Sequence, residues 1–229
     1  MISSDVRLIA RDIAVERGGR RLVGGLNLDL VGGSVLAVIG PSGCGKSSLL
    51  AVLAGWLTPA VGQVVVSPAL PTAVALLPQE LGLAAPDTAL ANAARGALPR
   101  RPFWRYPFGP TASDRREALA LLHDLGIADR AHMPIRMLSG GERQRCAVAR
   151  TLLARPPVLL FDEPVSQLDD TSAVTTLALI REQARRLGAV VVTALHQRQL
   201  VERFADHVLE ASPSDPCWRL TPVGEGTWK

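Results

Sequence analysis

The chain has 229 residues, enough for one large domain or two small ones, and its 48% hydrophobic and 20% charged content is ordinary for a globular protein. Its formal net charge of +4 suits a polyanionic ligand or a negatively charged membrane surface, but it is too small and too scattered to indicate nucleic-acid binding. No apolar stretch is long enough to cross a bilayer and the start does not resemble a signal peptide, so any membrane role is expected to be peripheral. The three cysteines, Cys44, Cys146 and Cys217, lack metal-ligand spacing, as expected of reduced thiols in a cytosolic protein.

The first third of the chain is typical of strands. Mixed apolar and polar runs at 6–15 and 22–30, with a turn at Gly18 and Gly19 between them, predict two strands. The short apolar run 34–39 predicts a buried strand, and a glycine-rich loop leads from it into a helix that ends at Gly55. Two further short strands are expected at 63–66 and 72–77.

From about residue 83 to residue 156 the pattern becomes helical. The apolar residues of one predicted helix recur at helical spacing: Ala118, Leu121, Leu122 and Leu125. Ser113 or Asp114 is expected to cap its start, and Gly126 to end it.

After residue 156 strands and helices alternate again. The run 158–161 predicts a buried strand and 189–193 another, with a helix between them marked by Leu177, Ile180, Ala184 and Leu187. Beyond Ala211 the proline-bearing tail shows no clear pattern. We therefore expect a parallel-sheet α/β core interrupted by a helical lobe.

Residues 40–47 read Gly-Pro-Ser-Gly-Cys-Gly-Lys-Ser and match the phosphate-loop pattern GxxxxGK[ST], directly after a buried strand and before a helix. Small residues let successive backbone N–H groups surround phosphate oxygens, and the helix directs its positive end at the same charge. Lys46 is expected to reach the β- and γ-phosphates, and Ser47 to ligate Mg²⁺. A chance glycine-rich turn is the alternative, but the strand and helix around it argue against that. The predicted ATP-binding residues are Gly40, Pro41, Ser42, Gly43, Cys44, Gly45, Lys46, Ser47 and Ser48.

Two carboxylates, Asp162 and Glu163, end the buried strand 158–161. In a parallel sheet they would lie at the same edge as the phosphate loop. Asp162 is expected to hold Mg²⁺ and Glu163 to orient the attacking water. Acids that simply cap a strand are the alternative interpretation, and the phosphate loop upstream favours the catalytic one.

Four more motifs resemble those of the ABC transporter ATPases, and they occur in that family's order. The sequence Leu138-Ser139-Gly140-Gly141-Glu142 resembles the signature LSGGQ with a common Glu variant. Gln79 resembles the Q-loop glutamine, and His196 the switch histidine. Residues 166–169, Ser-Gln-Leu-Asp, resemble the D-loop with Asp169 at its end, and the resemblance covers about residues 6–210.

This resemblance implies a P-loop NTPase (RecA-like) parallel-sheet core with an antiparallel β lobe and an inserted α-helical subdomain. The whole chain, 1–229, would form one ABC ATPase domain. Residues 1–82 and 157–211 would form the core and lobe, 83–156 the helical subdomain, and 212–229 a tail.

The resemblance also assigns roles. Ser139, Gly140, Gly141 and Glu142 would bind the ATP held by a partner subunit. Gln79 would contact metal and water, and His196 the γ-phosphate. Arg17 stands where the family normally has an aromatic residue that stacks on adenine. A guanidinium plane also stacks, but this departure leaves the adenine contact open.

The implied cofactors are ATP and Mg²⁺. The implied partners are a second ATPase subunit, integral-membrane permease subunits and a periplasmic or lipid-anchored solute-binding protein, with no nucleic acid. The chain would work as a peripheral protein at the cytoplasmic face of the inner membrane. An exporter, a lipoprotein-releasing ATPase, a soluble ABC ATPase and a regulatory subunit with little turnover are the alternatives.

Residues 96–109 contain four of the nine aromatic residues, Phe103, Trp104, Tyr106 and Phe108, interleaved with arginines. Such a segment could be a local mini-core, a nucleic-acid platform or a partner surface, and we favour a surface for the permease. The segment also resembles one in phosphonate importer ATPases. An importer of phosphonate, phosphite or a related oxyanion is therefore expected.

Overall fold

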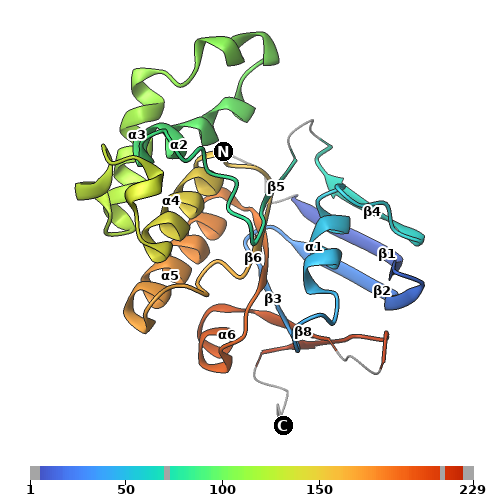
Figure 1. Cartoon of the computed structure of the whole chain (residues 1–229). Coiled ribbons are helices and arrows are strands. Elements are labelled where there is room, and N and C mark those ends of the chain that lie inside the picture. Colours follow the sequence, from blue (N-terminus) through green and yellow to red (C-terminus); the bar gives the residue numbers. More distant parts are fainter. Residues whose placement is uncertain (1–5, 70–72, 212–214, 224–229) are drawn as a thin grey trace. The chain divides into compact units, whose positions relative to one another are not determined.

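The computed structural model describes residues 6–69, 73–211 and 215–223 (Figure 1). The chain forms two compact units. The first comprises Met1–Leu76, Pro157–Glu163 and Arg181–Lys229, and the second comprises Leu77–Pro156 and Pro164–Ile180. The expected helical segment 83–156 lies within the second unit. That unit also includes residues 164–180, which the family resemblance assigns to the core.

The central sheet has six strands in the order β5-β6-β7-β3-β8-β9. Their bounds are β3 Val35–Ile39, β5 Val74–Leu77, β6 Val158–Asp162, β7 Val190–Ala194, β8 His207–Glu210 and β9 Arg219–Pro222. Strands β6, β7, β3 and β8 pair in parallel. Every residue of β6 and β7 is buried, which explains their continuous apolar runs. The strands expected at 34–39, 158–161 and 189–193 are confirmed within one residue at each end.

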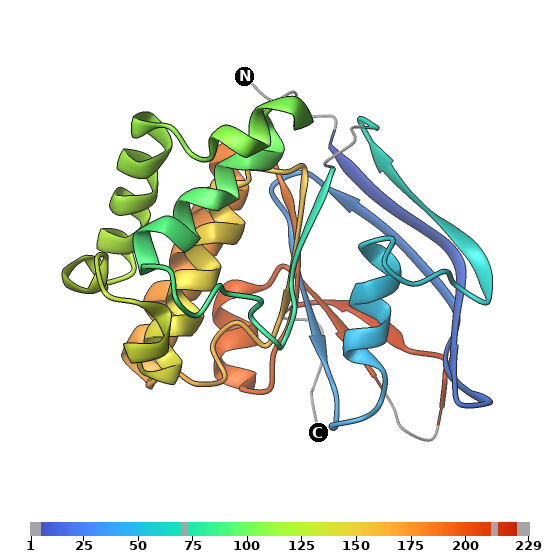
Figure 2. The ribbon, with the colours of Figure 1, turned by 45° about the horizontal axis from the view of Figure 1, so that its top comes forward.

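A second, antiparallel sheet has the order β2-β1-β4, with β1 at Arg7–Arg17, β2 at Arg20–Val31 and β4 at Val61–Ser67. Gly18 and Gly19 have positive φ angles of 58° and 74°, as a tight hairpin turn requires. Helix α1, Lys46–Leu53, lies between the two sheets (Figure 2). Its Leu49 and Leu50 are fully buried in a hydrophobic core shared with both sheets.

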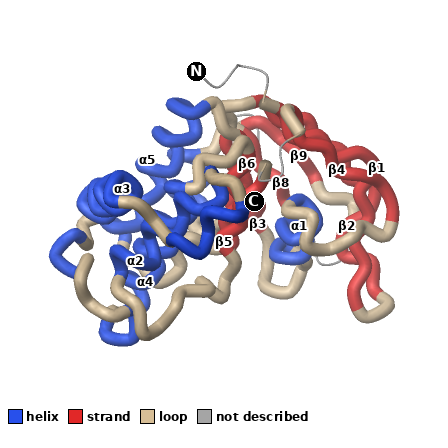
Figure 3. The backbone as a smooth tube through the Cα atoms, turned by 90° about the horizontal axis from the view of Figure 1, so that it is seen from above, coloured by secondary structure: helices blue, strands red, loops and turns tan. Residues whose placement is uncertain are grey.

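The second unit is mainly helical. It contains α2 Ala89–Ala94, α3 Ala112–Asp124, α4 Gly140–Leu153 and the first part of α5 Asp170–Leu187, together with the short 3-10 helices η1 Arg95–Arg100, η2 Phe103–Phe108, η3 Ala128–Arg130 and η4 Ile135–Met137. Helices α2, α3 and α4 pack against one another (Figure 3). Among the described residues, no helix is both long and apolar enough to cross a membrane.

The predicted cap of α3 is wrong. The helix is capped by Thr111, whose hydroxyl accepts from the backbone N–H of Asp114. Asp114 completes a capping box by accepting from the backbone N–H of Thr111 at 2.7 Å. Gly126 follows the helix with φ at 69°, as predicted for a C-terminal glycine.

The end of the chain is more ordered than expected. The sequence shows no clear pattern beyond Ala211, but in the structure β9 pairs antiparallel with β8 and Trp218 is buried. Helix α6, Arg198–Phe204, was also not predicted. Of the strand expected at 72–77, residue 72 lies outside the described residues and β5 occupies the rest from Val74.

Candidate functional site

The phosphate loop joins β3 to α1 through three glycines, Gly40, Gly43 and Gly45, whose φ angles are 146°, 77° and 115°. Residues that carry a side chain rarely adopt these φ angles. A Cβ atom on Gly40 would lie 2.7 Å from the carbonyl oxygen of Ala211, and one on Gly45 would lie 2.9 Å from the Cβ of Leu22. Backbone conformation and close packing therefore both require glycine at the two ends of the loop.

Lys46 is the first residue of α1 and is only 5% exposed. Its Nζ donates to the backbone carbonyls of Gly40, at 2.8 Å, and Pro41, at 3.1 Å. The ammonium group is thereby held across the loop, at the positive end of a helix. Two positive features at one place make an anion site suited to phosphate.

Asp162 ends β6 and is 7% exposed. Burial raises the pKa of its carboxyl group, and the hydrogen bond from the Ser47 hydroxyl and the charge of Lys46 act against this rise. A buried carboxylate beside a hydroxyl is an oxygen donor pair of the kind Mg²⁺ accepts, together with phosphate oxygens. Within the part of the chain that the structure describes there is no group of three His, Cys, Asp or Glu side chains that could hold a metal by themselves. The Ser47 hydroxyl and the Asp162 carboxylate fit Mg²⁺ when phosphate oxygens of a bound nucleotide supply further ligands.

Glu163 and His196 meet at the ends of adjacent strands. Asp162 pairs with Ala194 in the parallel register of β6 and β7, which brings the residues just beyond them together. The Oε1 of Glu163 lies 2.5 Å from the Nε2 of His196. Glu163 has φ at 54°, an unfavourable angle for a side-chain-bearing residue and of a kind that often marks functional positions.

In the second unit, the signature sequence forms the start of α4. Ser139 is the N-cap: its hydroxyl accepts from the backbone N–H of Glu142 at 3.2 Å, and Glu142 accepts from the backbone N–H of Ser139 at 2.8 Å. Glu142 also pairs with Arg130 at 3.1 Å. The hydrogen bond from the Ser139 backbone is the main cause of the lowered pKa of Glu142. The Glu variant of the signature thus caps its own helix.

The D-loop packs against this helix. Gln144, which the sequence did not single out, accepts from the backbone N–H of Gln167 at 2.9 Å and donates to the Ser166 hydroxyl at 3.3 Å. A Cβ on Gly140 would lie 2.1 Å from the Oε1 at the end of the flexible Gln167 side chain, whereas one on Gly141 would lie 2.9 Å from the backbone carbonyl oxygen of Gln167, so the close packing against the backbone is at Gly141. Asp169 accepts from the backbone N–H of Ser172 at 2.9 Å, at the start of α5.

The two remaining predicted residues are exposed. Gln79 lies two residues after β5, in the second unit, and Arg17 ends β1, in the first. The structure thus gathers Lys46, Ser47 and Asp162 around the phosphate loop, places Glu163 against His196, and gathers the signature and D-loop residues within the second unit.

The capping role of Glu142 gives a testable prediction. Glu142→Ala is expected to lower the free energy of unfolding by about 1 kcal/mol, whereas Glu142→Gln, which also completes a capping box, should lose less. Because the pKa is lowered in the folded protein, the contribution of Glu142 is present above its unfolded value, near 4.5, and is lost as the pH falls through the folded value. Denaturant titrations at neutral and acidic pH check this. Equal losses for the two variants at neutral pH would contradict it.

This arrangement of phosphate loop, strand-end carboxylates and parallel sheet defines a P-loop NTPase. The family model described as ABC transporter matches residues 23–166. The chain is 38% identical to the phosphonates import ATP-binding protein PhnC 1 of Natronomonas pharaonis, over 84% of each chain. It is 37% identical to the hemin import ATP-binding protein HmuV of Pseudomonas aeruginosa, over 94% of this chain and 87% of that one.

Among solved structures, an inward-facing metal-chelate type ABC transporter matches with a TM-score of 0.81 and 26% identity, over 96% of this chain and 84% of that one. The chain belongs to the ABC transporter family of ATPases, whose members hydrolyse ATP to drive transport.

Proposed function

We propose that this chain is the ATP-hydrolysing subunit of an importer and that two copies close face to face on two ATP molecules. The observation that carries the proposal is the contact of Glu163 with His196 at one sheet edge. The same compact unit holds the buried side chains of Lys46 and Asp162, with the exposed Ser47 hydroxyl hydrogen-bonded to Asp162. Each of these groups has a role in the proposed phosphoryl transfer.

ATP binds with its β- and γ-phosphates on the backbone N–H groups of the loop and on Lys46. Ser47 and Asp162 would hold Mg²⁺, and the family resemblance gives Gln79 a contact to metal and water. Bound Mg²⁺ neutralises the charge that develops on the phosphate oxygens. Glu163 orients the attacking water and accepts its proton, while His196 holds the Glu163 carboxylate and contacts the γ-phosphate. Arg17 is proposed to stack its guanidinium plane on the adenine.

The signature residues support a dimer. Ser139 accepts a hydrogen bond from Glu142, but its own O–H can still donate to a phosphate oxygen. Together with the N–H groups of Gly140 and Gly141, it starts the 14-residue helix α4 and forms a second anion site. In the proposed dimer this site meets the ATP of the opposing copy, and Asp169 lies at the same boundary.

A permease partner is supported by η2. None of the six residues of η2, all of them described, is buried, which argues against a mini-core. Phe103 and Phe108 are 81% and 82% exposed, and the guanidinium of Arg105 lies 4.9 Å from the ring centroid of Trp104. Exposed aromatic groups of this size mark interaction surfaces.

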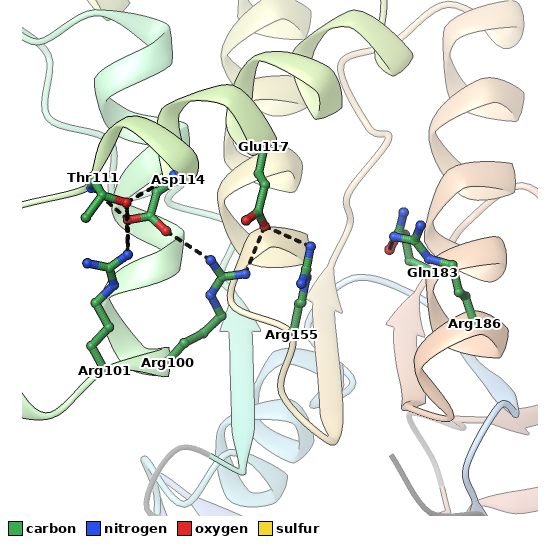
Figure 4. Close-up of polar contacts among 8 residues, drawn as sticks. All are labelled: Arg100, Arg101, Thr111, Asp114, Glu117, Arg155, Gln183 and Arg186. Atoms are coloured by element: carbon green, nitrogen blue, oxygen red, sulfur yellow. Dashed lines mark hydrogen bonds and ion pairs between the residues drawn. The ribbon is translucent and has the colours of Figure 1, made fainter. Parts of the chain in front are cut away.

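An ion-pair network around the buried Asp114 holds the segment before η2 in place (Figure 4). Arg100 pairs with Asp114 at 3.0 Å and with Glu117 at 3.0 Å, and Arg101 also pairs with Asp114. The aromatic surface therefore follows an anchored residue, which reduces the ordering cost when a partner binds.

The double substitution Trp104→Ala with Arg105→Ala is expected to reduce co-purification of the permease severalfold and to leave ATP affinity unchanged, because the exposed segment is proposed to bind the permease, while the phosphate loop belongs to the other compact unit. Trp56→Ala, at a tryptophan that is 63% exposed, is the matched control and should change neither. Pull-down of tagged permease and equilibrium ATP binding measure the two effects. Loss of ATP binding in the double variant would contradict the assignment.

The solute is proposed to be a phosphonate, phosphite or related oxyanion, delivered by a periplasmic or lipid-anchored binding protein, with this chain as a peripheral subunit at the cytoplasmic face. The Natronomonas pharaonis relative supports this choice. Because the hemin import ATP-binding protein of Pseudomonas aeruginosa is 37% identical to this chain, sequence identity alone does not select the solute. Reconstitution with the neighbouring permease tests it: methylphosphonate or phosphite should stimulate ATP turnover, and stimulation by hemin alone would overturn the choice. Outward transport would favour an exporter or a lipoprotein-releasing ATPase. ATPase activity that needs no permease would favour a soluble ABC ATPase.

A further inference from the structure

The C-terminal part of the first unit touches the phosphate loop at its start. Ala211, directly after β8, donates its backbone N–H to Ile39 at 2.8 Å. Its carbonyl oxygen is the atom that a Cβ on Gly40 would meet. Residues beyond 166 lie outside the family match, and 215–223 belong to none of the motifs described above. This segment is therefore a candidate for a role that the motifs do not include.

At the other end of the loop, Leu22 lies in a β-bulge. Val15 pairs with Val23 and Glu16 pairs with Arg21, so Leu22 is an extra residue on β2. A bulge bends the strand and redirects the side chain of the extra residue. The side chain of Leu22 lies against Gly45, with its Cβ 2.9 Å from where a Cβ of Gly45 would stand.

Trp218 holds this bulge. Its Nε1–H donates to the backbone carbonyl of Leu22 at 3.0 Å, and two residues earlier Pro216 accepts from the backbone N–H of Gly24 at 2.9 Å. Trp218 is only 7% exposed and belongs to the same hydrophobic cluster as Leu49 and Leu50 of α1. A buried indole N–H needs an acceptor, and here the acceptor is a carbonyl that the bulge removes from the regular β1–β2 pairing.

We propose that Trp218, acting through Leu22, positions the phosphate loop for ATP. This inference rests on the proposed function of that loop. Glycines give the loop conformational freedom that ATP binding must otherwise remove, so contacts that hold it in place raise affinity. Trp218 is a positioning residue: it contacts neither substrate nor the reacting atoms.

Trp218→Phe separates this role from packing, because the ring remains buried and only the N–H donor is lost. The dissociation constant for ATP with Mg²⁺ is expected to rise about fivefold to tenfold, the effect of losing one hydrogen bond. Turnover at saturating ATP should change by less than about twofold, since the loop binds ground state and transition state alike. Cys217→Ser, at the exposed neighbour, is the matched control and should change neither. Unchanged ATP affinity in the Phe variant would overturn the proposal.

A double-substitution cycle tests the route through Leu22. If Trp218 acts through Leu22, adding Trp218→Phe to Leu22→Ala should weaken ATP binding no further, whereas additive losses would overturn the route. Thermal unfolding of each full-length variant accompanies the binding measurement. The unsubstituted protein is measured beside Lys46→Ala, which should lose ATP binding. If the unsubstituted protein does not bind ATP, the proposed function is contradicted. If it binds ATP and Trp218→Phe binds equally well, only the inference about Trp218 is contradicted.

Discussion

Glu163→Gln is expected to reduce the maximal rate of ATP hydrolysis by about 10²–10⁴-fold, the usual contribution of a general base. The amide retains the size of the carboxylate and an oxygen that can accept from Nε2 of His196, but it does not accept a proton from water. Affinity for ATP should be unchanged, because Lys46, Ser47 and the loop glycines are untouched. The variant should therefore accumulate as an ATP-bound dimer.

Steady-state turnover and equilibrium binding of ATP check this pair of outcomes. Glu210→Gln is the matched control, because Glu210 is an exposed carboxylate at the end of β8 in the same sheet. It should hydrolyse ATP at the parent rate. Hydrolysis at the parent rate by Glu163→Gln would contradict the assignment of Glu163.

The second large effect is on stability. Asp114→Ala is expected to lower the free energy of unfolding of the second unit by about 3–5 kcal/mol, the range for removing one partner of a buried ion pair. The Asp114 side chain is 2% exposed and pairs with Arg100 and Arg101, which are themselves 23% and 22% exposed. It also accepts from the Thr111 N–H and hydroxyl at the start of α3. The substitution leaves these donors without their acceptor.

Asp29→Ala is the control, since Asp29 is 53% exposed and its bridge to Arg7 should contribute less than about 1 kcal/mol. Hydrogen exchange of the α3 amides measures the stability of the second unit. Burial raises the pKa of Asp114, but the Thr111 hydrogen bonds and the Arg101 charge outweigh this and hold it below its ordinary value. Its contribution is thus present above the unfolded value, near 3.8, and is lost as the pH falls through the folded one. Equal effects at Asp114 and Asp29 would contradict this account.

The sequence predicts those features that depend on local residue types. The phosphate loop needs small residues, a lysine and a hydroxyl in fixed order, and the buried strands are continuous apolar runs; both patterns are visible in a short window. The strand before Asp162 and the one before His196 were therefore found. The contact of Glu163 with His196 needed one more fact, the parallel register that aligns Asp162 with Ala194.

Features that depend on distant parts of the chain were missed. The bulge at Leu22 is stabilised by Trp218, 196 residues away, so no local pattern reveals either residue. Strand β9 is four residues long, and three of its residues are exposed and one is half-buried, which provides no buried apolar run to recognise. Gln144 looks like an ordinary polar helix residue until the D-loop packs beside it. Residue type alone does not identify Thr111 as the cap of α3, because Ser113 and Asp114 are also favoured N-cap residues and lie nearer to the apolar repeat.

In the proposed dimer, each ATP is shared between the phosphate loop of one copy and the signature of another. A structure of the Glu163→Gln protein with ATP and Mg²⁺ bound is the most direct test. We expect a γ-phosphate within hydrogen-bonding distance of Ser139 from the opposing chain as well as of Lys46 from its own. An ATP-bound structure in which Ser139 meets no phosphate of the partner copy would contradict it.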